Sequence, residues 1–303
     1  MRSAGVIGLG DMGSGLAKNL MAAGHPVAGR DLVADRQAAF AAMGGTACAT
    51  AAEVGARSEA LFVMVMNGAE VDDALFGPDG AVAAMPPGGT VILTATIKPA
   101  EARMVGSRLT EAGIGLIDSP VSGGFPGAQA GTLTMMAAGP DAVLDANRDV
   151  MEAVSASIHR VGTAAGDGQT VKACLQSLLG AMFAATFEAA ALAAKAGVPG
   201  QVILDVFSSS SGGCGIVNNA LEKIVDRQFQ GTGSRIDTMH KDLTISMALG
   251  EALGVPLHQA AAAMQTFHAG RTRHPGGDNW VATRVLEEIV GAELHRHAAK
   301  PIR

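Results

Sequence analysis

Three glycines near the N-terminus have the spacing of a turn that can bind phosphate. Gly8, Gly10 and Gly13 form the pattern G-x-G-x-x-G between an apolar run at 5–7 and a helical pattern at 14–23. In such a turn the first glycine permits the tight bend, the second lets the backbone approach a pyrophosphate, and the third lets the helix pack on the strand. The helix N-terminus adds N–H groups and a favourable dipole. The motif favours a dinucleotide over a purely structural turn. The residues expected to contact it are Gly8, Leu9, Gly10, Asp11, Met12 and Gly13.

An acidic residue follows the second apolar run, which spans 27–29. Asp31 lies about 20 residues beyond the glycines, where a carboxylate can accept hydrogen bonds from an adenine ribose. The same carboxylate would repel the 2′-phosphate of NADP, and Leu32 after it offers no positive partner. Arg30 can supply one, although it precedes the acid. We therefore expect NAD as the cofactor, with NADP as the alternative.

A single lysine stands at the start of the longest helical pattern. Gly166 and Gly168 precede this helix, and Lys172 lies in its first turns beside a long apolar run. The lysine either extends to water or points into a cleft. In a cleft its chemistry is useful, because burial lowers the pKa of an amine from about 10.4 and lets it accept the proton of an alcohol as hydride leaves carbon. Position alone leaves both interpretations open.

The stretch 118–133, "DSPVSGGFPGAQAGTL", lies between two apolar runs and is rich in glycine. It can be a flexible turn, or a loop that bares N–H groups to a ligand. Pro120 and Pro126 restrict the loop rather than loosen it. Ser122, Gly123 and Gly124 offer consecutive N–H groups, which is the arrangement of an anion-binding nest. We expect the first half of the stretch to bind an anion and the second half to serve turn geometry.

Two kinds of pattern must position these residues. Residues 1–162 alternate short apolar runs with helical patterns, which predicts a doubly wound α/β Rossmann domain with a largely parallel sheet. From 163 to 303 the patterns are helical, which predicts an all-α domain for substrate binding and oligomerisation, led by a long interdomain helix. The expected strands are 5–7, 27–29, 60–66, 90–94, 115–117, 133–137 and 158–161. The expected helices of the second domain include 172–196, 201–207, 239–253 and 257–269. We expect no strand after 161 and a frayed tail from His295.

Composition excludes several classes of protein. The chain has 303 residues, 48% of them hydrophobic, which is enough for two domains. Its net charge of -6 and the lack of a basic run argue against nucleic acid. The three cysteines, Cys48, Cys174 and Cys214, indicate reduced thiols in a cytoplasmic protein. The uncharged stretch 173–187 is too short to span a membrane, so we expect a buried helix there. No histidine or cysteine spacing predicts a metal site.

Four motifs together resemble a known family. "GLGDMG", "DSPVSGG", "GDGQTVK" and "KDL" occur in the order and spacing of the β-hydroxyacid dehydrogenases, and the resemblance extends to about residue 290. Among them the chain is similar to the 3-hydroxyisobutyrate dehydrogenase group. The resemblance implies hydride exchange between a nicotinamide and a small hydroxy acid bound between the domains, with Lys172 as general acid and base. It places the substrate carboxylate on Ser122, Gly123 and Gly124.

The resemblance also implies further contacts, each with a plainer explanation. It places cofactor contacts at Met66, Asn67, Thr96 and Lys241. Asn67 can instead be a turn residue before Gly68, Thr96 a cap of the following helix, and Lys241 part of a solvated helix face.

The chain departs from the family at two places. Many members have two asparagines after the catalytic lysine, where this chain has Leu175 and Gln176. The glutamine at position 176 is similar to the L-threonate dehydrogenase branch, and we expect it to bind substrate. That branch typically has a histidine at the position of Leu175, so Leu175 removes a polar contact with the substrate. Cys214 and Gly215 stand where relatives have Ser-Trp. These changes predict a bulkier or less polar acid than threonate.

Three functions follow from these patterns. The first is an NAD-dependent dehydrogenase of a small hydroxy acid. The second is an NADPH-dependent reductase of a small aldehyde or imine on the same fold, and the third is a non-catalytic dinucleotide-binding protein, which would not need Lys172. Small residues on the long helix, namely Ala181, Ala184 and Ala185, predict close helix contact in a homodimer or homotetramer.

Overall fold

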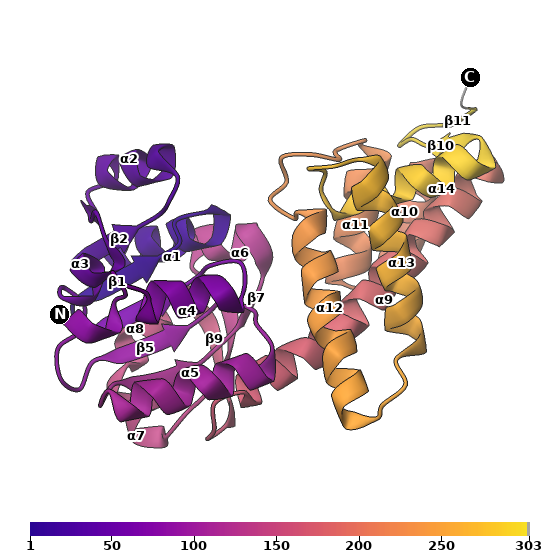
Figure 1. Ribbon diagram of the computed structural model, residues 1–303. Helices are drawn as coiled ribbons and strands as arrows, with labels where there is room; N and C mark the ends of the chain where they lie inside the picture. The colour runs from indigo at the N-terminus through magenta and orange to yellow at the C-terminus, as the bar shows by residue number, and fades with distance from the viewer. Residues whose placement is uncertain (302–303) are drawn as a thin grey trace. The chain divides into compact units, whose positions relative to one another are not determined.

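The computed structural model describes residues 1–301 and divides the chain into two compact units (Figure 1). The first unit is Met1–Lys172 and the second is Ala173–Arg303. The long helix α9, Asp167–Lys195, starts in the first unit and continues into the second.

The first unit is built on a nine-stranded sheet with the strand order β3-β2-β1-β4-β5-β6-β8-β7, in which β9 also pairs with β8. The strands from β3 to β6 are parallel, β8 runs antiparallel to β6 and β7, and β9 is parallel to β8. The strands are β1 (Ala4–Ile7), β2 (Val27–Arg30), β3 (Thr46–Ala47), β4 (Ala60–Val63), β5 (Thr90–Leu93), β6 (Gly115–Asp118), β7 (Val121–Ser122), β8 (Leu133–Ala138) and β9 (Ser155–Gly162).

Helices cover both faces of this sheet, and the strands bury side chains on each face. Val6 and Phe62 pack in one core cluster with Leu16 of α1, whereas Ile7 and Leu61 pack in another with helices α3, α4 and α5. Figure 1 shows α4 and α5 on one side, and α1 next to α6. The helices are α1 (Asp11–Ala22), α2 (Ala34–Ala42), α3 (Ala51–Gly55), α4 (Gly68–Phe76), η1 (Val82–Ala84), α5 (Pro99–Glu111), α6 (Gly124–Ala130), α7 (Asp141–Ala146) and α8 (Arg148–Val154).

The predicted Rossmann domain is therefore confirmed, and each of the seven expected strands is present. The sequence patterns missed the two-residue strands β3 and β7, because such short strands carry no alternation of apolar and polar residues. They also missed α6, since its segment, Gly124–Ala130, holds two glycines and a proline. The stretch 118–133 is thus an ordered strand and helix rather than a loop.

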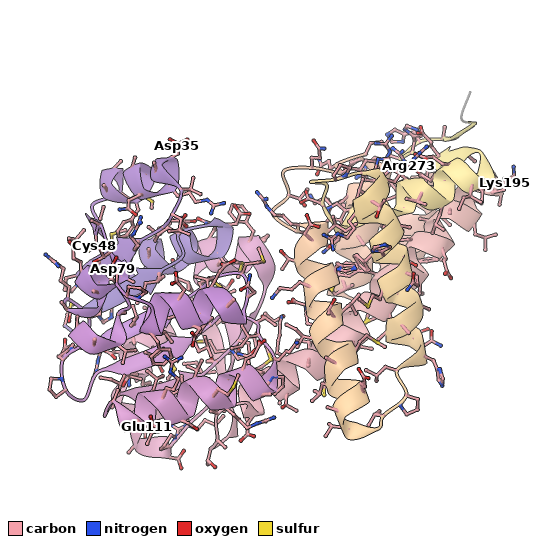
Figure 2. The ribbon with its side chains drawn as sticks, in the orientation of Figure 1. Asp35, Cys48, Asp79, Glu111, Lys195 and Arg273 are labelled. Carbon is pink, nitrogen blue, oxygen red and sulfur yellow. The ribbon has the colours of Figure 1, made fainter. Side chains whose placement is uncertain are left out.

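The second unit is a helical domain with an aromatic core. Phe183 and Phe187 of α9 pack against Phe267 and Trp280, with ring centroids 5.7 Å apart for Phe183 and Trp280 and 5.9 Å apart for Phe187 and Phe267. Lys195, labelled at the end of α9 in Figure 2, donates to the Val290 carbonyl at 2.8 Å. The elements are α10 (Gly200–Ser209), α11 (Gly215–Val225), α12 (Ile236–Leu253), α13 (His258–Arg273), η2 (Asn279–Val281), α14 (Ala282–Val290), β10 (Ala292–Leu294) and β11 (Ala299–Pro301).

Helix α9 is long and apolar enough, by length and composition alone, to cross a membrane. Half of its most apolar window is buried, however, and Phe183, Phe187 and Ala190 lie in the core of the second unit. This is the pattern of a core helix, as expected from the sequence.

The expectation of a frayed tail without strands is wrong for residues 292–301. Strands β10 and β11 pair as an antiparallel hairpin. Between them, the Arg296 side chain donates to both carboxylate oxygens of Asp226, at 2.7 and 2.6 Å, and the Arg296 N–H donates to the Val225 carbonyl at 3.1 Å. This polar segment has no apolar period from which a strand could be predicted. It is ordered by the bidentate ion pair of Arg296 with Asp226 and by backbone hydrogen bonds.

Candidate functional site

The three glycines of the first motif have different structural needs. Gly8 has φ +90°, and a Cβ there would overlap the Met64 carbonyl. A Cβ on Gly13 would overlap the Gly8 carbonyl, so α1 packs on the turn without room for a side chain. Gly10 has φ −69°, and a Cβ there would meet only the Arg36 side chain, 3.6 Å away. The fold itself does not require glycine at position 10, so the site fits a pyrophosphate approaching from outside.

Asp31 is bound directly to this glycine turn. Its Oδ2 accepts the Leu9 N–H at 2.7 Å and its Oδ1 accepts the Val33 N–H at 2.8 Å. The carboxylate is buried and lies just after the end of β2, at the carboxyl edge of the parallel strands. Each oxygen has a second lone pair, so Asp31 can still accept from a ribose hydroxyl. The structure therefore brings the glycine turn and Asp31 together as expected.

The cation beside Asp31 is Arg36 and not Arg30. Arg30 donates to the Gln37 side chain at 3.2 Å and to the Asp31 carbonyl, so it serves the local backbone. Arg36, in the first turn of α2, has its Nη1 3.6 Å from Asp31 Oδ2. No role was predicted for Arg36, although its place in the first turn of the helix after Asp31 is a signal in the sequence that could have identified it.

The expected contacts after β4 and β5 have distinct local roles. Asn67 is the N-cap of α4, where its side chain accepts the Glu70 N–H at 2.9 Å, so turn and cap chemistry explain this residue. Met66 precedes it and is exposed. Thr96 is not the helix cap that sequence analysis held open, since the N-cap of α5 is Lys98, followed by proline. Contacts of Met66, Asn67 and Thr96 with a cofactor stay predictions.

A buried carboxylate joins the sheet to the start of α9. Asp118, at the end of β6, is fully buried, and its Oδ2 accepts the N–H groups of Gly166 at 2.8 Å and Gln169 at 3.3 Å. The Gln169 Nε2 donates to Asp118 Oδ1 at 2.9 Å and to the Ala95 carbonyl at 3.0 Å, while its Oε1 accepts the Ile97 N–H at 3.0 Å. One amide thus holds the backbone on both sides of Thr96. Sequence analysis assigned no role to Asp118 or Gln169.

Burial raises the pKa of Asp118 to about 6, while hydrogen bonds from the Gln169 side chain and the Gly166 N–H act in the opposite direction. Because the pKa in the folded state lies above the ordinary value, this group stabilises the fold when protonated. That contribution is present below pH about 4 and is lost as the pH rises through 6.

Lys172 lies one helical turn after Gln169 and is buried, with 6% of its surface exposed. Its Nζ donates to the Val121 carbonyl at 2.9 Å. Val121 is the residue before Ser122, so the amine is held beside the segment that was expected to bind an anion. Lys172 therefore does not extend to water, and its place in a substrate cleft stays a prediction.

Ser122, Gly123 and Gly124 form the corner between β7 and α6. Gly123 has φ +126° and Gly124 has φ +59°, conformations that favour glycine, and both residues are exposed. The first N–H groups of a helix have no partner inside it. Ser122 pairs with Thr134 of β8, so the N–H groups that this corner can offer the expected carboxylate are those of Gly123 and Gly124.

The second unit holds a polar cluster of its own. Gln176 of α9 is buried, and its Nε2 donates to Asp242 Oδ2 at 2.6 Å. The other oxygen of Asp242 lies 2.9 Å from Lys241 Nζ. The structure thus brings the predicted residues Gln176 and Lys241 together through Asp242 of the "KDL" motif, for which no role was predicted. Lys241 therefore pairs with the buried carboxylate of Asp242 and is not part of a solvated helix face.

At the positions where this chain departs from the family pattern, Cys214 is the half-buried N-cap of α11, and a Cβ on Gly215 would meet no atom within 4 Å.

Within residues 1–301, no group of three histidine, cysteine or acidic side chains could hold a metal ion.

Two families match the two halves of the chain. Residues 3–162 match the NAD binding domain of 6-phosphogluconate dehydrogenase, and residues 166–286 match the NAD-binding domain of NADP-dependent 3-hydroxyisobutyrate dehydrogenase.

Full-length relatives agree with these matches. L-threonate dehydrogenase of Cupriavidus necator is 38% identical over 293 residues, which cover 97% of this chain and 98% of the relative. 2-(Hydroxymethyl)glutarate dehydrogenase of Eubacterium barkeri is 33% identical over 96% of each chain. The crystal structure of 3-hydroxyisobutyrate dehydrogenase from Salmonella typhimurium superposes with a TM-score of 0.87 at 34% identity, covering 94% of this chain and 100% of that one.

These relatives are dehydrogenases along their whole length, so the interpretation as a non-catalytic dinucleotide-binding protein is wrong. The chain belongs to the β-hydroxyacid dehydrogenase family and is an NAD(P)-binding hydroxyacid dehydrogenase.

Proposed function

We propose that this enzyme uses NAD to oxidise a small hydroxy acid of the 3-hydroxyisobutyrate and threonate class, with Lys172 as general acid and base. The observation that carries the proposal is the contact of the buried Lys172 amine with the Val121 carbonyl, 2.9 Å away, directly beside the Ser122–Gly124 corner. A base and an anion site then stand next to each other, as oxidation of a hydroxy acid requires.

The cofactor would be held by the glycine turn and Asp31, with the pyrophosphate over Gly10 and the adenine ribose at the carboxylate. When bound, the nicotinamide supplies a hydride acceptor in oxidation and a hydride donor in reduction. Asp31 supports NAD, because its buried carboxylate would repel a 2′-phosphate. Arg36 is the residue that would soften this repulsion, since it is the cation paired with Asp31.

Lys172 would move the proton of the reaction. In its neutral form an amine has a lone pair and two hydrogens, so it can donate to the Val121 carbonyl and still accept the substrate hydroxyl proton. The Val121 contact fixes the position of Nζ, and the corner at Ser122, Gly123 and Gly124 would hold the substrate carboxylate by the Ser122 hydroxyl and the N–H groups of Gly123 and Gly124. The reverse reaction returns the proton from the ammonium.

The orientation of Gln176 supports a substrate with a second hydroxyl group, in contrast to the bulkier or less polar acid that Leu175, Cys214 and Gly215 predict. Its Nε2 is committed to Asp242, so its Oε1 faces the remaining direction, where this buried oxygen has no hydrogen-bond partner within residues 1–301. A buried acceptor favours a ligand that brings a donor. Lys241 balances the charge of Asp242, which favours a neutral hydroxyl over an ammonium group. Gln176 lies four residues after Lys172 on the same helix, and therefore on the same face.

We also propose that the enzyme is a cytoplasmic homodimer or homotetramer. The free thiols of Cys48, Cys174 and Cys214 support a reducing compartment. Leu178 and Leu192 of α9 are exposed apolar side chains, which supports contact with another subunit. A monomeric mass in solution scattering would contradict the assembly.

Replacing Lys172 by alanine tests the general base. For Lys172→Ala we expect kcat to fall about 10²- to 10⁴-fold, the usual range for lost acid–base catalysis, with little change in the Kd of NADH measured by fluorescence. Lys195→Ala is the control, because Lys195 lies on the same helix but is exposed. A kcat near that of the wild type in Lys172→Ala would show that the base is another group.

Cofactor preference tests the role of Asp31. We expect a higher kcat/KM with NAD than with NADP. Replacement of the neighbouring cation in Arg36→Gln should lower kcat/KM for NADP several-fold further and leave NAD nearly unchanged, because only NADP brings a phosphate that needs the positive charge. A wild-type preference for NADP would overturn the assignment of NAD.

A substrate screen tests both the reaction and Gln176. With NAD and threonate, glycerate, 3-hydroxyisobutyrate or serine, absorbance of the reduced cofactor should show faster turnover of the first two, which carry a second hydroxyl. In Gln176→Met this preference over 3-hydroxyisobutyrate should shrink about 10- to 100-fold, as expected for one buried hydrogen bond. The control Gln201→Met, which removes the hydrogen bonds of Gln201 with Asp205 and Arg296 in the second unit, should keep it. An unchanged preference in Gln176→Met would exclude this contact.

A further inference from the structure

The side chain of Gln169 connects three segments that are far apart in the sequence. It donates to the Ala95 carbonyl and accepts the Ile97 N–H, both at 3.0 Å, and it donates to Asp118 at 2.9 Å. Gln169 and Asp118 are both fully buried. The amide nitrogen donates to a backbone carbonyl and to a buried carboxylate, and the amide oxygen accepts a backbone N–H. These three contacts fix the orientation of the amide.

The start of α9 is also fixed by close packing. A Cβ on Gly168 would overlap the Asp118 carbonyl, so the helix lies directly on the end of β6. The Asp118 carboxylate accepts the Gly166 N–H at 2.8 Å and thereby caps the first turn. Lys172 follows Gln169 by three residues, which is about one turn of helix. Any shift of this first turn therefore moves the amine away from Val121.

We propose that Gln169 and Asp118 are positioning residues that hold two parts of the active site in register. One part is the strand end around Thr96, on the side of the cofactor, and the other is the helical turn that carries Lys172. The proposal rests on the proposed role of Lys172 in the reaction. Neither Gln169 nor Asp118 touches a reacting atom; both act through the backbone that they hold.

The chemistry explains why a glutamine stands at position 169. The site needs two donations, to Ala95 and Asp118, and one acceptance, from Ile97. Only an amide supplies both kinds of group on one planar end. A glutamate would lose the donors and face the Asp118 carboxylate, an asparagine would be one methylene too short, and a methionine would fill the volume without hydrogen bonds.

The matched control lies at the opposite edge of the sheet. Asn147 is also a buried amide that holds backbone, since its Nδ2 donates to the Val143 carbonyl at 2.9 Å and to the Thr90 hydroxyl at 3.2 Å. Thr90 is the first residue of β5, whereas Ala95 and Ile97 follow its last residue. Asn147→Leu therefore removes comparable hydrogen bonds without touching the proposed link.

The experiment compares Gln169→Met with Asn147→Leu in the full-length enzyme. The substrate is the acid oxidised fastest by the wild type among threonate, glycerate, 3-hydroxyisobutyrate and serine. In Gln169→Met we expect kcat to fall about 10- to 100-fold, because displacement of a catalytic group by about 1 Å costs up to 10²-fold. Asn147→Leu should lower the thermal midpoint by a similar amount and keep kcat within about twofold of the wild type.

Hydrogen exchange gives a readout that does not depend on activity. The amides of Ile97 and Gly166 should exchange faster in Gln169→Met than in the wild type, and Asn147→Leu should leave them unchanged. A rescue variant tests the direction of the hydrogen bond. Asp118→Asn combined with Gln169→Glu restores one donor and one acceptor between the two side chains, so its kcat should exceed that of Gln169→Glu alone at the same pH.

Two results would overturn the proposal: a kcat of Gln169→Met within about twofold of the wild type, or an equal loss of kcat in Asn147→Leu, which would mean that any loss of stability has this effect. Failure of the proposed function is distinguishable. If the wild type oxidises none of the four acids, or if Lys172→Ala keeps its kcat, the reaction assignment fails. Hydrogen exchange at Ile97 and Gly166 then decides alone whether Gln169 holds the two segments.

Discussion

A buried carboxylate needs hydrogen-bond donors around it, and for Asp118 these lie at the start of α9. The N–H groups of Gly166 and Gln169 and the Gln169 side chain all point to it. Burial still raises its pKa to about 6, so at neutral pH the ionised group lowers stability relative to acid conditions. This loss of stability at neutral pH arises where the carboxyl edge of the parallel sheet meets the start of α9, the helix that carries Lys172.

The glycines of the site separate what the fold requires from what a ligand requires. Gly8 and Gly13 are fixed by overlap with backbone carbonyls, and Gly123 and Gly124 by their positive φ angles. Gly10 has neither constraint, so the absence of a side chain there matters for what can approach the turn from outside. This difference turns a short motif, which alone is weak evidence, into a specific argument for a dinucleotide, and it agrees with the family to which the chain belongs.

Elements with a hydrophobic period could be predicted from the sequence, and polar partners could not. Apolar runs predict most of the strands between Ala4 and Gly162 and the helix α9. A strand that is buried on both faces has few positions for polar residues, so its sequence is apolar throughout. The hairpin β10–β11 and the links of Asp118 to Gln169 depend on single polar contacts between residues far apart in the sequence. Lys172 can be singled out in the sequence because a lysine in an apolar segment is costly without a purpose, and its catalytic role stays a prediction. Gln169 has no charge that would mark it.

The helical period of α9 places three buried polar residues on one face. Gln169, Lys172 and Gln176 are spaced by three and four residues, so they lie along one face of the helix. The two glutamines each give their amide nitrogen to a buried carboxylate, Asp118 for the first and Asp242 for the second. Fixing the nitrogen also fixes the oxygen: that of Gln169 accepts the Ile97 N–H, whereas that of Gln176 has no hydrogen-bond partner in residues 1–301. The same hydrogen bond from an amide nitrogen to a buried carboxylate therefore has two consequences: it fastens the backbone before Lys172 and, beyond Lys172, it leaves the Gln176 oxygen with a fixed orientation and no partner among the described residues.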